Sequence, residues 1–384
     1  MKFEWTKKKL SDIADFNPRE TIKKGAIAKK IPMDVLRPFY RDIPYYVEEC
    51  FSGGTKFRNG DTIMARITPC LENGKTAQVS ILNDGEVGFG STEYIVFRAK
   101  EGIADKDYLY YLVCNPEVRE PAIKSMVGSS GRQRVQTDVV KNLEIDVPPL
   151  VEQEKIGSFL KAFDDKIALN DRINNNLEQQ AQAIYQQMFI DNARSDWAEG
   201  TLSDIADITM GQSPSGSSYN EDGTGTIFFQ GRAEFGFRFP SVRLYTTEPK
   251  RMARSNDTLM SVRAPVGDLN VAHMDCCIGR GLAAIHSKSH HQSFVLYTMF
   301  SLKKQLDVFN GEGTVFGSIN RNSLNDMPIL IPSDDILDEF ERIVAPMDLT
   351  IRNNYDENCR LQDIRDTLLP RLMSGELDVS DIDL

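Results

Sequence analysis

The hexapeptide LSDIAD occurs twice in this 384-residue chain, at residues 10–15 and again at residues 202–207. A tryptophan stands five residues before each copy, and Trp5 and Trp197 are the only tryptophans in the chain. The second copy follows the first at an offset of 192 residues (202 minus 10). Self-similarity at a fixed offset is the signature of an internal repeat, so we predict that the chain is duplicated.

Weaker matches follow the hexapeptide in the same order in both halves. Residues 60–69, GDTIMARITP, resemble residues 256–265, NDTLMSVRAP. VGFG at residues 87–90 resembles IGRG at residues 278–281. An identical hexapeptide followed by ordered weaker matches favours duplication over chance similarity between two ordinary sheets.

A last match leads into a long helical pattern in each half. VVKNLEIDVP at residues 139–148 matches SLNDMPILIP at residues 323–332, now at an offset of 184 (323 minus 139). Beyond it, positions that alternate in steps of four and three form a heptad seam. The predicted seam contains Ile156, Leu160, Phe163, Ile167, Asn170, Asn174, Leu177 and Ile184 in the first helix and Phe340, Val344, Met347, Ile351, Asn354, Asn358, Leu361 and Leu368 in the second. Two helices of this kind can bury their seams against each other, each about 60 Å long at 1.5 Å per residue.

The middle of each predicted helix carries two asparagines, Asn170 with Asn174 and Asn354 with Asn358. Buried asparagines in a coiled coil set register and partner at some cost in stability. The alternative is that these four side chains face solvent where the helices splay apart. The sequence leaves both interpretations open.

The second helical pattern departs from the first at three positions. Arg365 interrupts the apolar seam, and Pro346 and Pro370 are expected to bend or fray the helix. These departures limit how symmetric the two helices can be.

The rest of the chain consists of two globular segments of mixed character. Short β-like runs alternate with glycine and proline turns, and each segment has one clear helical stretch, near residues 106–114 and 294–306. We therefore predict an α+β fold with globular segments at residues 1–150 and 194–333. The helical segments would occupy residues 151–193 and 334–384, the latter with a C-terminal tail.

The charge is distributed unevenly along the chain. The formal net charge of −11 by itself argues against a nucleic-acid-binding protein. Residues 334–384, however, hold 5 Lys+Arg against 14 Asp+Glu, whereas residues 1–150 hold 23 against 21. A near-neutral segment can carry a basic face, so nucleic acid stays a candidate ligand. No run of about 18 apolar residues and no secretory N-terminal pattern is present, which predicts a cytoplasmic protein.

The sequence lacks the motifs of several catalytic and cofactor sites. It has no Asn/Asp-Pro-Pro-aromatic motif for adenine methylation, no GxGxxG turn and no GxxxxGK[ST] loop. His286 and His290 have the i,i+4 spacing of some zinc ligands, but without HExxH or a cysteine pair beside them we predict no metal site. A duplicated chain without duplicated catalytic residues indicates repeated recognition, and we predict no catalytic residue.

Polar loops with arginine and amide side chains recur in both globular segments. Arginine donates two hydrogen bonds to guanine, and glutamine or asparagine pairs with adenine, so these residue types suit base recognition. We predict DNA contacts at Ser129, Ser130, Arg132, Gln133 and Arg134 in the first segment and at Gln212, Ser213, Ser215, Gln230, Arg232, Ser318, Asn320 and Arg321 in the second. For any one of them, a solvated surface position is the alternative.

With these features together, the sequence resembles the specificity (S, HsdS) subunits of bacterial and archaeal type I restriction–modification systems. The resemblance covers essentially the whole chain. It is carried by LSDIAD after a tryptophan, GSTEYIVFRAK (90–100), GSSGRQRV (128–135), VPPLVEQEKIGSFL (147–160), MGQSPSGSSYN (210–220) with FFQGRAEFG (228–236), and LLPRLMSGELDV (368–379). Each string alone is weak, but their combination in this order is specific.

The resemblance implies a division of labour between this chain and its partners. The globular segments would be target recognition domains in pseudo-twofold duplication, each reading one half of a bipartite site in double-stranded DNA. The helices would be conserved spacers, packed as an antiparallel coiled coil that sets the gap between the half-sites. Two methyltransferase (M) subunits would dock on them, and restriction (R) subunits would add translocation and cleavage. S-adenosylmethionine, ATP and magnesium would bind the partner subunits, and this chain would be a non-catalytic member of the complex.

Two other functional classes remain open from the sequence. One is a coiled-coil scaffold whose globular segments bind protein or peptide. The other is an enzyme that uses a cleft in one globular segment. Salt-dependent DNA binding would favour a DNA-specificity subunit over the scaffold, and methylation by the chain alone would favour the enzyme.

Overall fold

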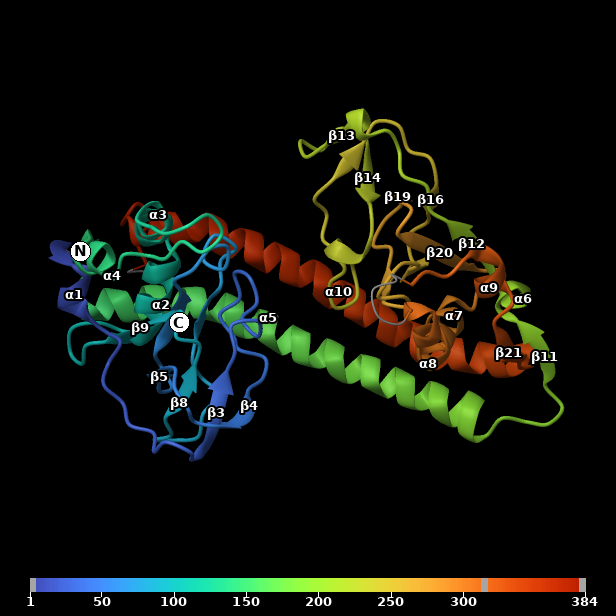
Figure 1. The fold of residues 1–384 in the computed structure, drawn as a ribbon, viewed down its shortest axis with the longest axis horizontal. Coiled ribbons are helices and arrows are strands. Elements are labelled where there is room, and N and C mark those ends of the chain that lie inside the picture. Colours follow the sequence, from blue (N-terminus) through green and yellow to red (C-terminus); the bar gives the residue numbers. More distant parts are fainter. Residues whose placement is uncertain (1–4, 312–316, 380–384) are drawn as a thin grey trace. The chain divides into compact units, whose positions relative to one another are not determined.

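The computed structural model describes residues 5–311 and 317–379 and divides the chain into two compact units. Unit 1 contains Met1–Arg172 together with Asn354–Leu384, and unit 2 contains Ile173–Asn353. The division passes through both long helices, α5 (Leu150–Tyr185) and α10 (Asp334–Met373), so each unit holds a segment of each helix (Figure 1).

Unit 1 combines two four-stranded sheets, a two-stranded ribbon and short helices. The first sheet has the strand order β2-β9-β6-β7, and the second has the order β4-β3-β8-β5. The strands are β1 (Thr6–Lys9), β2 (Ala14–Phe16), β3 (Ile27–Ile31), β4 (Val47–Cys50), β5 (Thr55–Phe57), β6 (Thr62–Ala65), β7 (Thr76–Gln78), β8 (Gly88–Gly90), β9 (Tyr94–Ala99) and β10 (Glu144–Val147), and the short helices are α1 (Leu10–Ile13), α2 (Lys106–Cys114), α3 (Pro116–Lys124) and α4 (Thr137–Lys141). Strand β1 pairs antiparallel with β10, immediately before α5.

Unit 2 combines a four-stranded sheet, a five-stranded sheet, a two-stranded ribbon and short helices. A four-stranded sheet has the order β12-β20-β17-β18, and a five-stranded sheet has the order β13-β15-β14-β19-β16. The strands are β11 (Ala198–Thr201), β12 (Ala206–Met210), β13 (Tyr219–Asn220), β14 (Thr226–Phe229), β15 (Tyr245–Thr246), β16 (Met252–Ala253), β17 (Thr258–Ser261), β18 (Leu269–Val271), β19 (Cys276–Ile278), β20 (Leu282–Ser287) and β21 (Pro328–Ile331). The α-helices are α6 (Leu202–Ile205), α7 (Gln292–Ser301), α8 (Lys303–Leu306) and α9 (Arg321–Asn325). A π-helical turn, η1 (Gln186–Asp191), follows α5, and the 3-10 turns are η2 (Gly216–Ser218), η3 (Arg232–Glu234) and η4 (Asp307–Asn310). Strand β11 pairs antiparallel with β21, immediately before α10.

The two copies of LSDIAD take the same local structure. Each forms one helical turn, α1 or α6, followed by a strand, β2 or β12. An aspartate in each turn accepts a hydrogen bond from the backbone N–H three residues earlier: Lys9 donates to Asp12 at 3.0 Å, and Thr201 donates to Asp204 at 2.7 Å. This carboxylate satisfies one of the N–H groups that a helix start leaves without a partner. The first leucine of each turn is fully buried.

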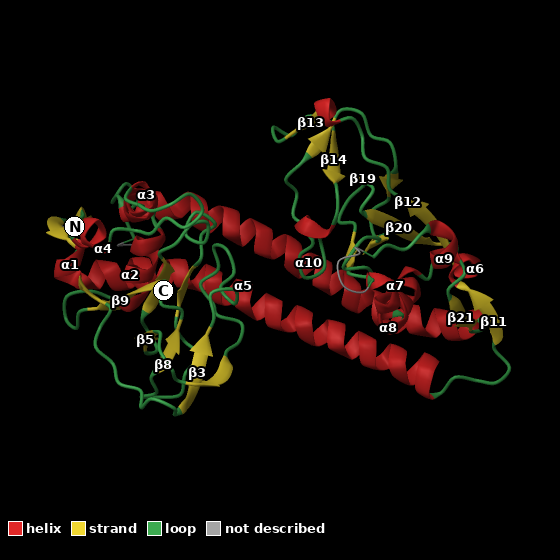
Figure 2. Ribbon diagram, in the orientation of Figure 1, coloured by secondary structure: helices red, strands yellow, loops and turns green. Residues whose placement is uncertain are grey.

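Both units contain helices and strands, which Figure 2 shows in red and yellow. The predicted helical stretch at residues 106–114 is helix α2, and the one near residues 294–306 is divided between α7 and α8. The mixed α+β class is therefore confirmed. In the described part of the chain, no helix has both the length and the apolar character that a membrane span needs.

The positions of the predicted seam are buried or half-buried in α5 and α10. In unit 1, Asn170 and Asn358 are almost inaccessible, and the Asn170 amide donates to the Asn358 side-chain oxygen at 2.9 Å. The Asn358 amide in turn donates to Asp171 at 2.9 Å. These two asparagines therefore do not face solvent, and they join the two helices by hydrogen bonds.

Arg365, which interrupts the apolar pattern, has a specific partner in unit 1. Its guanidinium forms an ion pair with the buried Asp164 of α5, whose other carboxylate oxygen accepts a hydrogen bond from the Tyr111 hydroxyl. The departure in sequence is thus compensated by an acidic residue on the facing helix. Helix α10 continues through Pro346 and Pro370 to Met373, so neither proline ends it.

Unit 2 has a similar buried cluster in which the arginine comes from a different segment. Arg238, only 4 % exposed, lies in the loop between η3 and β15. Its guanidinium contacts Glu178 of α5 and Asp348 of α10, each at 3.0 Å. Asp348 also accepts a hydrogen bond from the Tyr297 hydroxyl of α7 at 2.9 Å. This cluster attaches the globular part of unit 2 to its helix pair.

Candidate nucleic-acid interface

A polar cavity of about 230 Å³ in unit 2 collects several residues from the ends of strands. Its lining residues are Ser213, Gln230, Gly231, Arg232, Ser261, Arg263, Ala264, Arg280 and Gly281. They follow β12, β14, β17 and β19 or end these strands, so the two sheets of unit 2 together position them. Three of the sequence-predicted residues, Ser213, Gln230 and Arg232, therefore lie together.

The loops around this cavity approach so closely that side chains are excluded at two glycines. A Cβ atom added to Gly281 would lie 2.9 Å from the backbone oxygen of Gln230, and one added to Gly211 would lie 2.1 Å from that of Gly279. The Arg280 N–H donates to the Ser213 hydroxyl at 3.2 Å. The glycines of the IGRG string thus place Arg280 beside the Gln230 and Ser213 loops.

The three arginines of the cavity differ in their electrostatic environment. Arg232 forms an ion pair with Asp268, which Lys303 also approaches at 3.4 Å. Arg263 and Arg280 are exposed, and within the described residues neither forms an ion pair. Their guanidinium groups are therefore available to an external acceptor such as a guanine edge or a phosphate.

Arg263 and Arg280 were not among the sequence-predicted contacts. Both stand in strings that mark the internal repeat, NDTLMSVRAP and IGRG. An arginine directly beside the end of a buried strand was the available signal. The sequence alone could not show the importance of this signal, because it does not show which strand ends lie together.

Ser318 lies next to the cavity through backbone pairing. It forms an isolated antiparallel bridge with Arg263, and the Ala264 N–H donates to the Gly317 carbonyl at 3.0 Å. Arg321 is exposed at the first turn of α9, and Asn320 caps that helix, accepting from the Ser323 N–H at 2.9 Å. Residues 312–316 of this loop lie outside the described residues.

The remaining predicted contacts of unit 2 lie in the loop after β12. Gln212 is exposed, and its backbone N–H donates to the Ile278 carbonyl at 2.9 Å. The Ser215 hydroxyl lies 2.8 Å from that of Ser217. Neither Gln212 nor Ser215 lines the cavity.

The predicted contacts of unit 1 form a hairpin-like loop at residues 127–134. Val127 and Arg134 pair through both backbone hydrogen bonds, which leaves Ser129, Ser130 and Arg132 exposed at the tip. Gln133 is half-buried, and its carbonyl accepts from the Thr68 N–H at 3.0 Å.

Arg134 forms an ion pair with an acidic residue of its own unit. Its Nε and Nη2 atoms donate to the two carboxylate oxygens of Glu93 at 2.9 and 2.7 Å. These hydrogen bonds lower the pKa of Glu93, which keeps the carboxylate charged. Arg134 therefore anchors the loop, and Arg132 is the guanidinium that the loop presents outward.

The histidine pair singled out by its spacing is separated in the structure. His286 lies in β20, and its Nδ1 atom is 2.6 Å from a carboxylate oxygen of Asp257. His290 lies in the loop after β20, with His291 and Asp338 instead. The i,i+4 spacing does not fall on a helix, so it brings no shared ligand face.

The family of type I restriction modification DNA specificity domains matches residues 2–179 of the chain. A type I restriction enzyme specificity subunit of Methanocaldococcus jannaschii, MjaX, is 28 % identical over 98 % of this chain and 94 % of the relative. The HindI specificity subunit of Haemophilus influenzae is 23 % identical over 83 % of this chain and 87 % of the relative.

A solved structure is similar to this chain in its fold. The S subunit of a type I restriction–modification system from M. genitalium aligns with a TM-score of 0.60 at 15 % identity, covering 96 % of each chain. Together with the sequence relatives, these matches extend over both halves of the chain. Over both of its halves the chain is therefore similar to the specificity subunits of type I restriction–modification systems, and residues 2–179 match the DNA specificity domain of that family.

Proposed function

We propose that each globular segment of this chain reads one half of a bipartite DNA site. Residues 1–150 would form the first target recognition domain and residues 194–333 the second. The helical segments, residues 151–193 and 334–384, would pair as an antiparallel coiled coil that sets the distance between the half-sites. The observation that carries this proposal is the arginine-containing cavity at the strand ends of unit 2.

The order of strands in the two units supports an internal duplication. In β2-β9-β6-β7 and β12-β20-β17-β18, each sheet starts with the strand that follows LSDI, and each next strand precedes the helix α2 or α7. In unit 1, an isolated bridge joins Ile67 to Arg134, and in unit 2 one joins Arg263 to Ser318. These pairs stand at matching places of the aligned sequence strings.

Buried contacts to the helix pair also correspond between the units. The Tyr111 hydroxyl donates to Asp164 in unit 1, and the Tyr297 hydroxyl donates to Asp348 in unit 2. The two aspartates are 184 residues apart (348 minus 164), which is the offset of the heptad seams. Each globular part therefore meets its helices through the same type of hydrogen bond, as expected for duplicated domains.

The contacts between the helices support an antiparallel pair. In unit 1, Asp164 meets Arg365, whereas the later residue Asn170 meets the earlier residue Asn358. In unit 2, the ring of Tyr185 lies 5.9 Å from that of Phe340. The asparagine contact would set the register of the coiled coil.

The partners follow from what the chain contributes to the complex. The acidic helical segment at residues 334–384 suits docking of protein subunits better than contact with DNA phosphates. Two methyltransferase (M) subunits would dock there, and restriction (R) subunits would complete the complex. S-adenosylmethionine, ATP and magnesium would bind those subunits, and this chain would supply only recognition and spacing.

Exchanging residues 1–150 for the matching segment of another specificity subunit is expected to change one half of the methylated motif. The other half and the gap should stay the same, because residues 194–333 and both helical segments are retained. Methylome sequencing of cells that express the exchanged chain with its methyltransferase subunits measures both halves at once.

The reciprocal exchange, of residues 194–333, serves as the matched control and should change the opposite half. A change in both halves after either exchange would contradict the proposal that each globular segment recognises one half-site independently. An unchanged motif after both exchanges would assign recognition to another subunit.

A further inference from the structure

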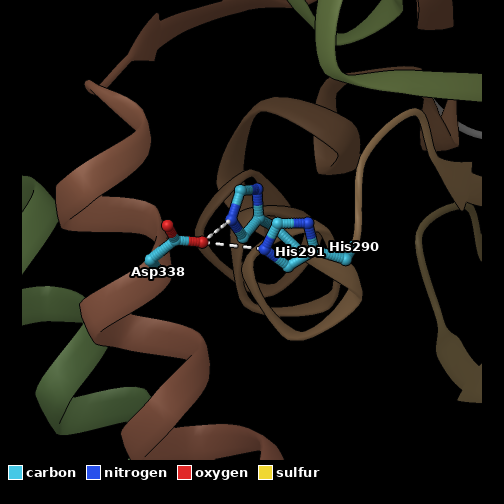
Figure 3. Close-up of side chains that lie close together, drawn as sticks. All are labelled: His290, His291 and Asp338. Carbon is cyan, nitrogen blue, oxygen red and sulfur yellow. Dashed lines mark hydrogen bonds and ion pairs between the residues drawn. The ribbon is translucent and has the colours of Figure 1, made fainter.

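Three side chains with metal-binding atoms meet in unit 2, away from the arginine-containing cavity. His290 and His291 belong to the loop between β20 and α7, and Asp338 lies in the second turn of α10 (Figure 3). Within residues 5–311 and 317–379, this is the one group of three or more such residues whose ligand atoms all lie within 4.8 Å of one another.

The three groups converge on one point. The Nε2 atoms of His290 and His291 lie 2.7 and 2.9 Å from the same carboxylate oxygen, Oδ1 of Asp338. Figure 3 shows both imidazole rings turned toward that oxygen. Two imidazole nitrogens and a carboxylate oxygen are the ligand set that zinc takes in open sites, where water fills the fourth position.

The spacing requires only a small adjustment to admit an ion. Zinc binds nitrogen and oxygen at about 2.0–2.1 Å, so ligand atoms at tetrahedral positions lie about 3.4 Å apart. Asp338 and His290 are 58 % and 75 % exposed, so both can move by the roughly 0.5–0.7 Å that separates the present contacts of 2.7 and 2.9 Å from that distance. His291, at 4 % exposure, supplies the fixed ligand.

A second set of contacts holds the buried histidine in a ligating orientation. The Ser289 hydroxyl lies 2.8 Å from Nδ1 of His291. A hydroxyl can donate or accept, so it can accept from Nδ1–H when Nε2 gives its lone pair to a metal. Metal-bound histidines usually donate their other ring N–H to such a partner.

The two segments that provide the ligands are already joined next to the site. Glu341, one turn after Asp338 on α10, accepts a hydrogen bond from the Phe294 N–H at the start of α7 at 2.9 Å. This contact keeps the loop and the helix together without an ion, so the site is largely preorganised.

We propose that His290, His291 and Asp338 bind one divalent transition-metal ion, with zinc as the expected occupant. The ion would link the β20–α7 loop to α10 and so strengthen the attachment of the globular part of unit 2 to its helix. Among first-row ions, nickel and copper share the preference for imidazole, so the ligand set alone does not distinguish zinc from them.

The test uses the full-length, untagged chain after removal of metals with a chelator. Zinc is titrated in competition with a chromogenic zinc indicator, and the unfolding temperature is measured with and without zinc. We expect one zinc per chain and a higher unfolding temperature with zinc, because the ion binds only the folded arrangement of ligands.

Two site variants and one matched control separate this site from adventitious binding. His290→Ala and Asp338→Asn are each expected to weaken zinc binding at least tenfold and to abolish the thermal shift; both residues are exposed, so the fold should be kept. His286→Ala removes a histidine of the same unit that lies outside the cluster, and it should leave both readouts unchanged.

Two results would overturn the proposal. One is the absence of a stoichiometric zinc ion in the unmodified chain. The other is equal zinc affinity in Asp338→Asn and the unmodified chain, which would mean that the adjacent histidines bind the ion without α10.

Discussion

Arg365→Ala is expected to lower the free energy of unfolding by about 3–5 kcal/mol, because it leaves a buried carboxylate without its counter-ion. The side chains of Arg365 and Asp164 are 6 % and 5 % exposed. The Tyr111 hydroxyl would remain as a hydrogen-bond donor to Asp164, but it carries no charge. Equilibrium urea unfolding, followed by circular dichroism, measures the loss.

Arg371→Ala provides a matched control in the same helix. Arg371 pairs with Glu376 at 2.8 Å, with both side chains well exposed, and exposed pairs contribute about 0–1 kcal/mol. A similar small loss in both variants would contradict the assigned role of Arg365. The double variant Arg365→Leu with Asp164→Leu should recover much of the stability, because it removes both buried charges together.

Arg263→Ala and Arg280→Ala should each weaken binding to the target DNA by about 1–3 kcal/mol, or roughly 5- to 150-fold, if each guanidinium reads a guanine. The loss should fall on one base position of the second half-site for each variant. Competition between the target site and sites with single base changes, at one fixed salt concentration, resolves this pattern.

Arg243→Ala is the control for an exposed arginine of unit 2 outside the cavity. Arg243 is paired with Glu221 and Glu234, so we expect its removal to leave DNA affinity unchanged. A uniform loss across all sequences in the Arg263 or Arg280 variant would assign that arginine to a phosphate contact. Unchanged binding in both variants would remove the cavity from the interface.

Elements with a local origin could be predicted from the sequence. The LSDIAD turns depend on an aspartate three residues after the capped N–H, a contact that lies within the hexapeptide. The long helices follow from heptad spacing, and the structure has helices α5 and α10 where the two seams lie. Periodicity and short-range capping carry this information.

Contacts between distant residues could not be predicted in this way. Arg134 was predicted as a DNA contact and Arg365 as a break in the apolar seam, yet each has a carboxylate partner, 41 and 201 residues away. Which strand ends meet, and therefore which arginines share a cavity, depends on the sheet order. Local patterns do not encode such pairings.

The division of the chain has a consequence for its synthesis on the ribosome. Unit 2 is one continuous stretch of sequence, whereas unit 1 joins the beginning of the chain to its last segment. Leu369, Leu372 and Met373 of α10 pack into the same core as Ile156 and Leu160 of α5. Ile156 and Leu160 are therefore translated before unit 2, whereas their apolar neighbours on α10 are translated after it, and until then Ile156 and Leu160 lack those neighbours.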